Sequence, residues 1–541
     1  MPARLRTDKM QQTLQLKLLP SEAATDSAVR EHAARAAAVP VKDISGFYLL
    51  KRSIDARGRQ VHIMLTLHVF INEPYQDREH IKLHFPELPN AAKKVIIIGA
   101  GPAGLFAALK LIEKGIRPIL LERGKDVRSR RRDLALLNKE GIINPESNYC
   151  YGEGGAGTYS DGKLYTRSTK RGDIGRILHL FVQFGAENNI LYDAHPHIGT
   201  NKLPQIIQAM RQQITDSGGV LLFEKKVTGL ILQGDRIKEV RTADGDQFEA
   251  DNVILATGHS ARDIFHLLHQ EKILIAAKPF ALGVRIEHPQ SLIDSIQYGV
   301  QPGQLISSGD EPREKGVKTP WLPPSSYNLV EQVRGKGVFS FCMCPGGIIA
   351  PASTAPGELV VNGWSPSKRN NPFSNSGIVV SVEEKDWSAF EKHGPLAALY
   401  FQQSVEQKAF EGGGGKFVAP AQRMTDFVAR KTSGSLPSCS YVPGLHSTPL
   451  QEVLPPLIYE SLRLGFTAFG KKMKGYFTDE AVVVATESRT SSPVRIPRDP
   501  ESLQHPQIKN LYPCGEGAGY AGGIVSAAMD GERVADRIAD L

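Results

Sequence analysis

The stretch KKVIIIGAGPAGL, residues 93–105, decides the fold expected for this chain of 541 residues. A run of Val and Ile is typical of a strand buried in a parallel sheet. Gly99, Gly101 and Gly104 follow in G-x-G-x-x-G spacing and open the helix-like segment AGLFAALKLIEKG. The next apolar run, PILLE, ends at Glu122, 21 residues beyond Gly101. This order of strand, glycine turn, helix and acidic strand end predicts a dinucleotide-binding βαβ unit.

Each of these residue types has a physical role in such a unit. Gly99 permits the tight turn, Gly101 lets the backbone approach a pyrophosphate, and Gly104 lets the helix pack closely on the strand. The helix N-terminus supplies N–H donors to the phosphates. The Glu122 carboxylate can accept hydrogen bonds from a ribose diol, and it would repel a 2′-phosphate, which disfavours NADP at this position. The motif alone leaves NAD and FAD open, and a glycine turn without a ligand is the simpler alternative.

A second glycine-rich stretch, CGEGAGYAGGIVSAAMDG at residues 514–531, settles the choice of cofactor. Only 18 residues follow Gly523, and they continue a helical pattern. A second βαβ unit would need a further strand with an acidic end roughly 20 positions on, so there is no room for it. We therefore expect this stretch to complete the site that Gly99 begins. A helix N-terminus at Gly522 and Gly523 would stabilise the negative charge that gathers near N1 and O2 of a reduced flavin. A helix-capping turn is the structural alternative.

A third segment, EGGAGTYSDGKLYT at residues 153–166, is too rich in glycine for a helix or a regular strand and suits a loop that wraps a ligand. Thr158, Ser160 and Asp161 in it can bond ribityl or phosphate oxygens. Together the three segments and the strand end LATGHS predict FAD and these cofactor-binding residues: Gly99, Ala100, Gly101, Pro102, Ala103, Gly104, Glu122, Arg123, Gly155, Ala156, Gly157, Thr158, Asp161, Lys163, Val227, Thr257, Gly258, Gly515, Glu516, Gly522, Gly523 and Ile524.

Four segments differ in pattern along the chain. Residues 1–90 contain two strand-like runs, an Ala-rich helix opening at Ser21 and a hairpin turning near Ala56–Gly58, which predicts a small α+β domain. Residues 91–270 alternate strand and helix. Residues 271–480 carry strand-like runs between Pro- and Gly-rich loops, and residues 481–541 return to the first pattern. We expect an α/β, Rossmann-like FAD/NAD(P)-binding domain with an inserted α+β, mainly antiparallel cap domain and the small N-terminal domain. The segments SSGDEPREKGVKTPWLPPSS and FEGGGGKF are predicted to be mobile loops.

Composition sets wider limits. The net charge of +8 is a mild indication of anionic ligands or nucleic acid, and cofactor phosphates account for part of it. Five cysteines are too few for a disulfide framework, no secretory signal is evident, and the longest apolar stretch, Val95–Leu109, is too short to span a bilayer. These features predict a cytoplasmic protein with no membrane segment.

The motifs GAGPAGL, ERG, EGGAGTYSDGKL, ATGHSARD, FALGVRIEHPQ, QYG, FCMCPGG, RTSSPVRI and CGEGAGYAGGI resemble those of a large bacterial family of FAD-dependent oxidoreductases, and they cover residues 93–541. The segment KRSIDAR looks like part of the family's small N-terminal domain. The resemblance implies a two-part fold of the glutathione-reductase type and bound FAD. It implies no substrate, because few members have one assigned. No second G-x-G-x-x-G unit is visible, so a dedicated NAD(P) domain is not expected. NADH or NADPH as a transient electron donor stays open.

Three residues are candidates for catalysis. His259 and Arg262 follow a strand end on the side from which a substrate approaches a doubly wound fold. Arg489 in TESRTSS can hold a carboxylate or the flavin edge. The alternatives are a hydrogen bond near the cofactor for His259 and a structural loop for Arg489.

Other conspicuous side chains have simpler expectations. Cys342 and Cys344 face one side of a strand if FCMC is a strand, and packing or cavity lining is favoured over a redox or metal pair. No metal site is predicted. Arg285 and Glu287 alternate onto one strand face, which predicts a salt bridge. The run RSRRR, residues 128–132, is expected to form a solvated helix face, with one Arg in reach of the cofactor phosphates.

Three functions are compatible with these motifs. The first is an oxidoreductase that passes a hydride through the flavin to or from a small molecule under the cap domain. The second is a tRNA-modifying or nucleic-acid-associated flavoenzyme, suggested by the net charge and by Lys51, Arg52 and Arg57 of the small domain. The third is a flavin-binding redox sensor without turnover. The sequence leaves the substrate, the electron donor and the oligomeric state open.

Overall fold

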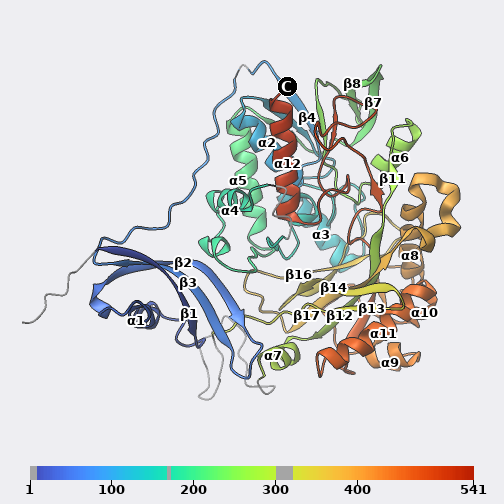
Figure 1. The fold of residues 1–541 in the computed structure, drawn as a ribbon. Coiled ribbons are helices and arrows are strands. Elements are labelled where there is room, and N and C mark those ends of the chain that lie inside the picture. The colour runs from blue at the N-terminus through green and yellow to red at the C-terminus, as the bar shows by residue number, and fades with distance from the viewer. Residues whose placement is uncertain (1–8, 90, 167–171, 300–320) are drawn as a thin grey trace, which may run out of the picture.

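A five-stranded parallel sheet forms the centre of one part of the molecule (Figure 1). The computed structural model describes residues 9–89, 91–166, 172–299 and 321–541. The sheet has the order β22 (Leu511–Pro513), β10 (Val253–Leu255), β4 (Lys94–Ile98), β5 (Arg117–Leu121) and β6 (Val220–Leu222). The βαβ unit predicted around Gly99 is present as β4, α2 (Pro102–Glu113) and β5.

Both faces of this sheet are covered, because its strands are apolar on both sides. Ile97 belongs to the core on one face, whereas Ile96 and Ile98 belong to the core on the other. Four helices pack on the first face: α2 (Pro102–Glu113), α4 (Ile174–Gln183), α5 (Leu203–Asp216) and α12 (Ile524–Ala539). The second face is covered by α6 (Arg262–Gln270) and by the small antiparallel sheet of β7 (Val227–Gln233), β8 (Arg236–Thr242) and β9 (Gln247–Glu249). The result is a Rossmann-like α/β fold, as the sequence predicts.

A seven-stranded sheet forms the second part, at the lower right of Figure 1. Its order is β13 (Val330–Val333), β14 (Lys336–Cys344), β17 (Phe373–Val382), β12 (Phe280–Pro289), β20 (Val482–Glu487), β18 (Ala419–Arg423) and β19 (Leu445–Ser447). All neighbouring strands are antiparallel except β18 and β19. The sheet therefore includes β20, which lies beyond residue 480, where we expect the second half of the cofactor domain to begin.

Further elements surround the seven-stranded sheet. Helices α8 (Ala397–Gly412), α9 (Met424–Ala429), α10 (Leu450–Val453) and α11 (Pro456–Lys472) contribute to its core. The remaining elements are α7 (Gln290–Tyr298), the hairpin of β15 (Ile348–Pro351) and β16 (Val361–Trp364), and the short pair β11 (Ala276–Ala277) and β21 (Val494–Arg495). The FEGGGGKF segment begins in the last turn of α8. Much of the other predicted loop, SSGDEPREKGVKTPWLPPSS, lies outside the described residues. No described helix combines the length and the hydropathy that a membrane crossing requires.

The N-terminal part is a three-stranded antiparallel sheet with one helix (Figure 1). Its order is β1 (Met10–Leu18), β3 (His62–Ile71) and β2 (Ile44–Asp55), and α1 (Asp26–Ala37) packs on it. The helix begins later than Ser21, because the Glu22 carboxylate accepts a hydrogen bond from the Leu19 N–H and closes a turn there. The Arg52 guanidinium bonds both carboxylate oxygens of Asp193, at 2.7 and 3.0 Å, and connects this sheet to the cofactor-binding part.

Close backbone packing between α12 and α2 generates a prediction. A Cβ atom at Gly531 of α12 would lie 2.1 Å from the carbonyl oxygen of Ala103 in α2. We expect Gly531→Ala to lower the free energy of unfolding by about 1–3 kcal/mol, because the clash outweighs the better helix propensity of alanine. The measurement is chemical denaturation followed by circular dichroism. Gly175→Ala in α4 is the matched control, since a Cβ there meets only the Asp173 carboxylate, at 3.1 Å. Equal stability of the two variants would contradict the packing.

Candidate functional site

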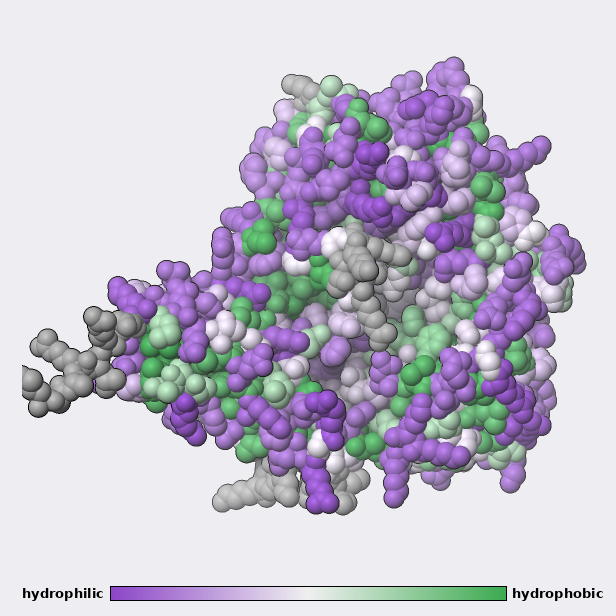
Figure 2. Space-filling model, in the orientation of Figure 1, coloured by the Kyte–Doolittle hydropathy of each residue, from purple (hydrophilic) through white to green (hydrophobic). Residues whose placement is uncertain are grey.

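A cavity of about 390 Å³ lies where the carboxyl ends of the parallel strands meet the seven-stranded sheet. Figure 2 shows the molecular face hollowed between these two parts. Most of the predicted cofactor-binding residues line this one cavity: Gly99, Gly101, Pro102, Ala103, Glu122, Arg123, Gly155, Ala156, Gly157, Asp161, Lys163, Val227, Thr257, Gly258, Glu516, Gly522, Gly523 and Ile524. Segments separated by four hundred residues of sequence therefore contribute to a single site.

Four other predicted residues lie behind the cavity wall. The Ala100 N–H donates to Glu122, and the Thr158 hydroxyl donates to the carbonyl of Glu153. The Gly515 N–H donates to the Asp530 carboxylate at 2.7 Å. Gly104 packs against the backbone of the turn. These residues shape the wall and do not line the cavity.

The glycine turn has the geometry that the sequence predicts. Gly99 has φ +104°, and a Cβ there would lie 2.5 Å from the Ala256 carbonyl oxygen. A Cβ at Gly104 would lie 2.0 Å from the Gly99 oxygen, so this glycine permits close packing of helix on strand. At Gly101 the nearest atom to a Cβ, in Gly155, is 3.9 Å away. The space in front of Gly101 is therefore open for a ligand.

Glu122 is held at one end of the cavity by backbone donors. Its side chain accepts hydrogen bonds from the N–H groups of Ala100, Gly124 and Gly152, each at 2.9 Å. The residue is only 5% exposed and lines the cavity. Since each carboxylate oxygen can accept more than one hydrogen bond, Glu122 can also bind hydroxyl groups of a ligand.

Arg130 organises the loop that borders the cavity. It lies in α3 (Val127–Glu140), is fully buried, and donates to the carbonyl oxygens of Asn148, Tyr149, Glu153 and Gly155 at 2.8–2.9 Å. Burial lowers the pKa of this guanidinium. The expectation of a solvated face for residues 128–132 is therefore wrong at this position. The signal was present in the sequence, because Val127, Arg130 and Leu134 recur at helical spacing on one face.

The N-terminus of α12 also lines the cavity, through Gly522, Gly523 and Ile524. Gly523 is its N-cap residue and no side chain caps the helix. A Cβ at Gly522 or Gly523 would meet no atom within 4 Å. The partial positive charge of this helix end is thus directed into open space. His259 lines the cavity beside it, with Nδ1 3.4 Å from Oε2 of Glu516.

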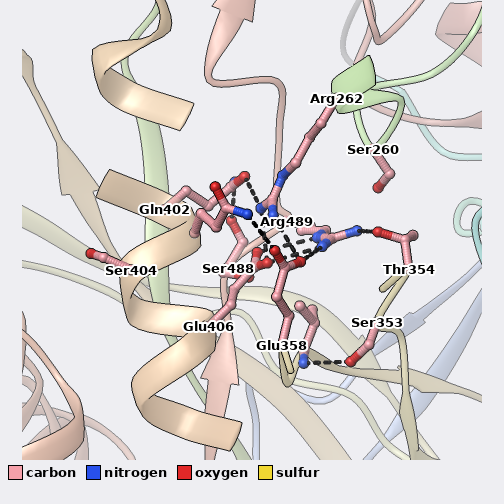
Figure 3. A network of polar contacts seen from close by, with 12 residues as sticks. Ser260, Arg262, Ser353, Thr354, Glu358, Gln402, Ser404, Glu406, Ser488 and Arg489 are labelled. Atoms are coloured by element: carbon pink, nitrogen blue, oxygen red, sulfur yellow. Dashed lines mark hydrogen bonds and ion pairs between the residues drawn. The ribbon is translucent and has the colours of Figure 1, made fainter. Parts of the chain in front are cut away.

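The other predicted catalytic residues belong to a buried ion-pair network (Figure 3). Arg262 of α6 donates to Glu358 at 2.9 Å and to Glu406 at 2.8 Å. Arg489 donates to Glu406 at 2.9 Å, to Glu358 at 3.2 Å and to the Thr354 hydroxyl at 2.7 Å. Arg489 borders the cavity, whereas Arg262 does not. Both cations are paired with carboxylates. Because Arg262 also lies outside the cavity lining, the structure does not support a catalytic role for Arg262.

The two carboxylates of this network differ in their pKa. Burial alone would raise the pKa of Glu406, but the charges of Arg262 and Arg489 outweigh it and bring the pKa down to about 2. Burial has the larger effect at Glu358, whose pKa is raised. Glu406 is therefore the carboxylate whose negative charge the network holds most firmly.

Arg285 has a different partner from the one expected. It donates to Glu487 at 2.7 Å, on the neighbouring strand β20. Glu287 instead accepts hydrogen bonds from the Ser440 backbone and hydroxyl. The predicted salt bridge between Arg285 and Glu287 is wrong, because each side chain reaches a cross-strand or loop partner that sequence spacing does not reveal.

Several residues that line the cavity are not predicted from the sequence. Tyr151 donates to the Ser260 carbonyl and lies under the Arg123 guanidinium, 4.0 Å from the ring centre. Other lining residues that the sequence does not predict are Cys150, Tyr165, Lys225, Lys226, Phe341, Asn362 and Thr490; the cavity is also lined by Cys342, for which packing or cavity lining is expected. The last four residues come from the seven-stranded part. In the sequence, only the FCMCPGG and RTSSPVRI motifs indicate that this part contributes to the site.

Family models match several parts of the chain. "FAD-dependent protein, C-terminal domain-like" matches residues 279–490, "FAD binding domain" matches residues 92–137, and "FAD dependent oxidoreductase" matches residues 196–311. A domain of unknown function matches residues 10–70.

Two curated relatives are similar to the chain. An uncharacterized protein of Clostridium beijerinckii is 37% identical over 515 residues, which are 92% of this chain and 93% of that protein. The tRNA uridine 5-carboxymethylaminomethyl modification enzyme MnmG of Syntrophotalea carbinolica is 27% identical over 177 residues, 32% of this chain and 26% of the enzyme.

Among solved structures, L-proline dehydrogenase from P. horikoshii is 13% identical, with a TM-score of 0.32 over 84% of this chain and 94% of that one. Glycine oxidase from Bacillus cereus is 12% identical, with a TM-score of 0.29 over 83% and 95%.

The buried network generates a prediction about stability. Glu406→Gln leaves two buried guanidinium groups without their main counter-charge, and we expect the free energy of unfolding to fall by about 3–5 kcal/mol at pH 7. Glu411→Gln, at an exposed position of the same helix, is the control and should change little. The measurement is urea denaturation of both variants. A loss no larger than that of the control would contradict the network.

The Glu406→Gln variant also tests how the stability of the protein depends on pH. The pKa of Glu406 is about 2 in the folded chain, below the value of about 4.3 expected when unfolded. Its contribution to stability is therefore complete above about pH 4.3 and is lost as the pH falls toward 2. The stability difference between wild type and Glu406→Gln should shrink over this range and stay constant from pH 5 to 7. A difference that shrinks above pH 5 would contradict the assignment.

Proposed function

Since the chain belongs to a family of FAD-dependent oxidoreductases, we propose that it passes a hydride between a bound FAD and a small molecule held against the seven-stranded sheet. The observation that carries the proposal is the continuity of the cavity. The glycine turn with Glu122, the N-terminus of α12 and residues of the seven-stranded part all line this one cavity.

The residues present fit FAD. Glu122 would accept hydrogen bonds from the adenosine ribose, and the open space at Gly101 with the start of α2 would receive the pyrophosphate. Asp161 and Glu516, which also line the cavity, are suited to ribityl hydroxyls. FAD bound here would supply the hydride-transfer chemistry. The uncapped N-terminus of α12 would stabilise negative charge on the ring system.

The substrate would bind under the seven-stranded sheet, which acts as the cap. Phe341 and Asn362 line this wall from β14 and the β15–β16 hairpin, and Thr490 lines it just beyond β20. His259 is our candidate for moving a proton at the substrate, with Glu516 beside its Nδ1. NADH or NADPH would enter from the same side as a transient donor. None of the five cysteines forms a disulfide in the structure, which agrees with the reducing cytoplasm as the place of action.

A tRNA-modifying role is the second candidate, supported by the partial similarity to the tRNA uridine modification enzyme. That similarity covers about a quarter of the enzyme. Of the basic residues in the small domain, Arg52 pairs with Asp193 and Arg57 pairs with Asp55, so part of the positive charge is already neutralised. Binding of transfer RNA at low salt, weakening steeply with added salt, would favour this candidate. The absence of binding at low salt would remove it.

Gly522 provides a prediction for the cofactor. Its backbone accepts a side chain, and a Cβ there meets no atom within 4 Å. We expect Gly522→Leu to fold normally and to bind FAD at least about tenfold more weakly, because the side chain would occupy the space of the ring system. Flavin content per protein and melting temperature are the measurements. Gly434→Leu, at an exposed loop glycine that also has open space around it, is the matched control. Full flavin content in Gly522→Leu would contradict the placement.

The direct test is the visible spectrum of the purified protein, with the released chromophore identified by chromatography. We expect FAD, and anaerobic bleaching of its absorbance near 450 nm by a hydride donor, with NADH and NADPH tried first. A protein that stays colourless after incubation with FAD would overturn the proposal. A bound flavin that no hydride donor reduces would favour the redox sensor.

A further inference from the structure

A lysine ammonium lies beside two cysteine sulfurs at the wall of the cavity. Nζ of Lys163 is 3.7 Å from Sγ of Cys342 and 3.9 Å from Sγ of Cys344, and it also donates to the carbonyl oxygen of Met343. The guanidinium of Arg285 approaches from the other side, with Nη2 3.6 Å from Sγ of Cys344 and 2.6 Å from the carbonyl oxygen of Cys342. Two cations thus converge on the two thiols.

The charges around the thiols do not balance without another anion. Lys163 and Arg369 share one carboxylate, Asp161, at 3.6 and 3.1 Å. Arg285 pairs with Glu487 at 2.7 Å. Three cations therefore face two carboxylates in a cluster in which Arg285, Asp161 and Glu487 are almost fully buried. The Lys163 side chain is 35% exposed and reaches the cluster from the cavity side. The cluster therefore has one excess positive charge, which favours an anion beside it.

Among the residues that the structure describes, the other groups in contact with the cluster do not supply that negative charge. Burial raises the pKa of Glu487 to about 7 in spite of Arg285, so this carboxylate provides at most one negative charge at neutral pH. Burial and Arg369 lower the pKa of the nearby His197 to about 4, which keeps the imidazole neutral. Asn362 and Asn375, which bond Arg285, carry no charge. The remaining candidates are the two thiols that Lys163 contacts.

Cys342 is the thiol that opens into the cavity. Cys344 is fully buried, whereas Cys342 is partly exposed and lines the cavity. The pairing of β14 with β17 shifts register between Phe341 and Cys344, and Cys342 has φ +46° within this irregularity. A left-handed conformation at a non-glycine residue is costly and often marks a functional position. The regular alternation that would place both thiols on one face is therefore broken.

We propose that Cys342 carries a thiolate in the resting protein and is a modification site for soft carbon electrophiles that enter the cavity. The thiolate completes the charge balance of Lys163, Arg285, Arg369, Asp161 and Glu487. In the reaction its sulfur forms a bond to the electrophilic carbon and the leaving group departs as an anion, so no proton is transferred. Nearby lysine and arginine are the surroundings in which cysteines become reactive.

The pKa shifts of the two thiols agree in direction with this geometry. The thiol of Cys344 beside it, followed by the charges of Lys163 and Arg285, holds the pKa of Cys342 well below its usual range despite burial. Burial and the neighbouring Cys342 raise the pKa of Cys344, which would stay protonated. As a protonated thiol, Cys344 donates its S–H to the carbonyl oxygen of Cys342, at 3.3 Å.

The experiment measures alkylation of the protein as purified, with its cofactor, by iodoacetamide at pH 6.0 and pH 8.5. Peptide mass spectrometry follows Cys342 and Cys439 in the same sample. Cys439 is the internal reference, because burial and Glu287 raise its pKa. We expect the rate at Cys342 to change less than about threefold between the two pH values, whereas a thiol of pKa about 8.5 changes by roughly a hundredfold or more.

Two lysine variants test whether Lys163 lowers the pKa of Cys342. Lys163→Gln should slow labelling of Cys342 at pH 6.0 at least about tenfold while leaving it measurable at pH 8.5, which shows that the site still forms. Lys110→Gln, a lysine that pairs with Glu113 and Asp536 away from the thiols, is the control and should label as wild type. Labelling of Cys342 that rises with pH in parallel with Cys439 would overturn the proposal. So would an unchanged rate in Lys163→Gln, or a Cys342 that stays unlabelled while Cys439 reacts. Flavin content is measured on the same sample, so failure here is separate from failure of the proposed function.

Discussion

The ion pairs of Arg262 and Arg489 with Glu358 and Glu406 are the interaction on which the rest of the site depends. Arg262 begins α6 on the parallel sheet, Glu406 lies in α8, and Arg489 follows the end of β20 (Figure 3). The cavity exists only where the two sheets are held at a fixed separation. A network of two cations and two anions that is removed from water fixes this separation more rigidly than an apolar contact, because each charge has a directional partner.

Much of the cofactor end of the site could be predicted from the sequence, because its residues interact with backbone that is close to them in the sequence. The glycine spacing, the strand before it and Glu122 lie within one short segment, and each residue answers to a constraint on the nearby backbone. The C-terminal stretch could be assigned by length alone, since too few residues follow Gly523 for a second unit. Its helix begins at Ile524, as the pattern indicates.

The opposite wall could not be predicted in the same way, because its residues are defined by long-range pairing. Arg262 lies 96 and 144 positions from its two carboxylate partners, and Arg285 lies 202 positions from Glu487. Runs of arginine usually face solvent, and the sequence therefore predicts a solvated position for Arg130. Its carbonyl partners nevertheless all lie in the loop that follows α3. Charged residues that satisfy one another across a fold leave little trace in local composition.

The pairing of β22 with β10 affects the order in which parts of the chain can fold. The parallel sheet gains its last strand at residues 511–513, and α12 packs on α2 only when the final residues are present. Closing a contact across four hundred residues is slow compared with local folding. The cavity is therefore incomplete until residues 511–539 have been synthesised, whereas the small N-terminal sheet, whose strand pairing is local, can form long before. Closure of the cavity is thus a late step in the folding of this topology.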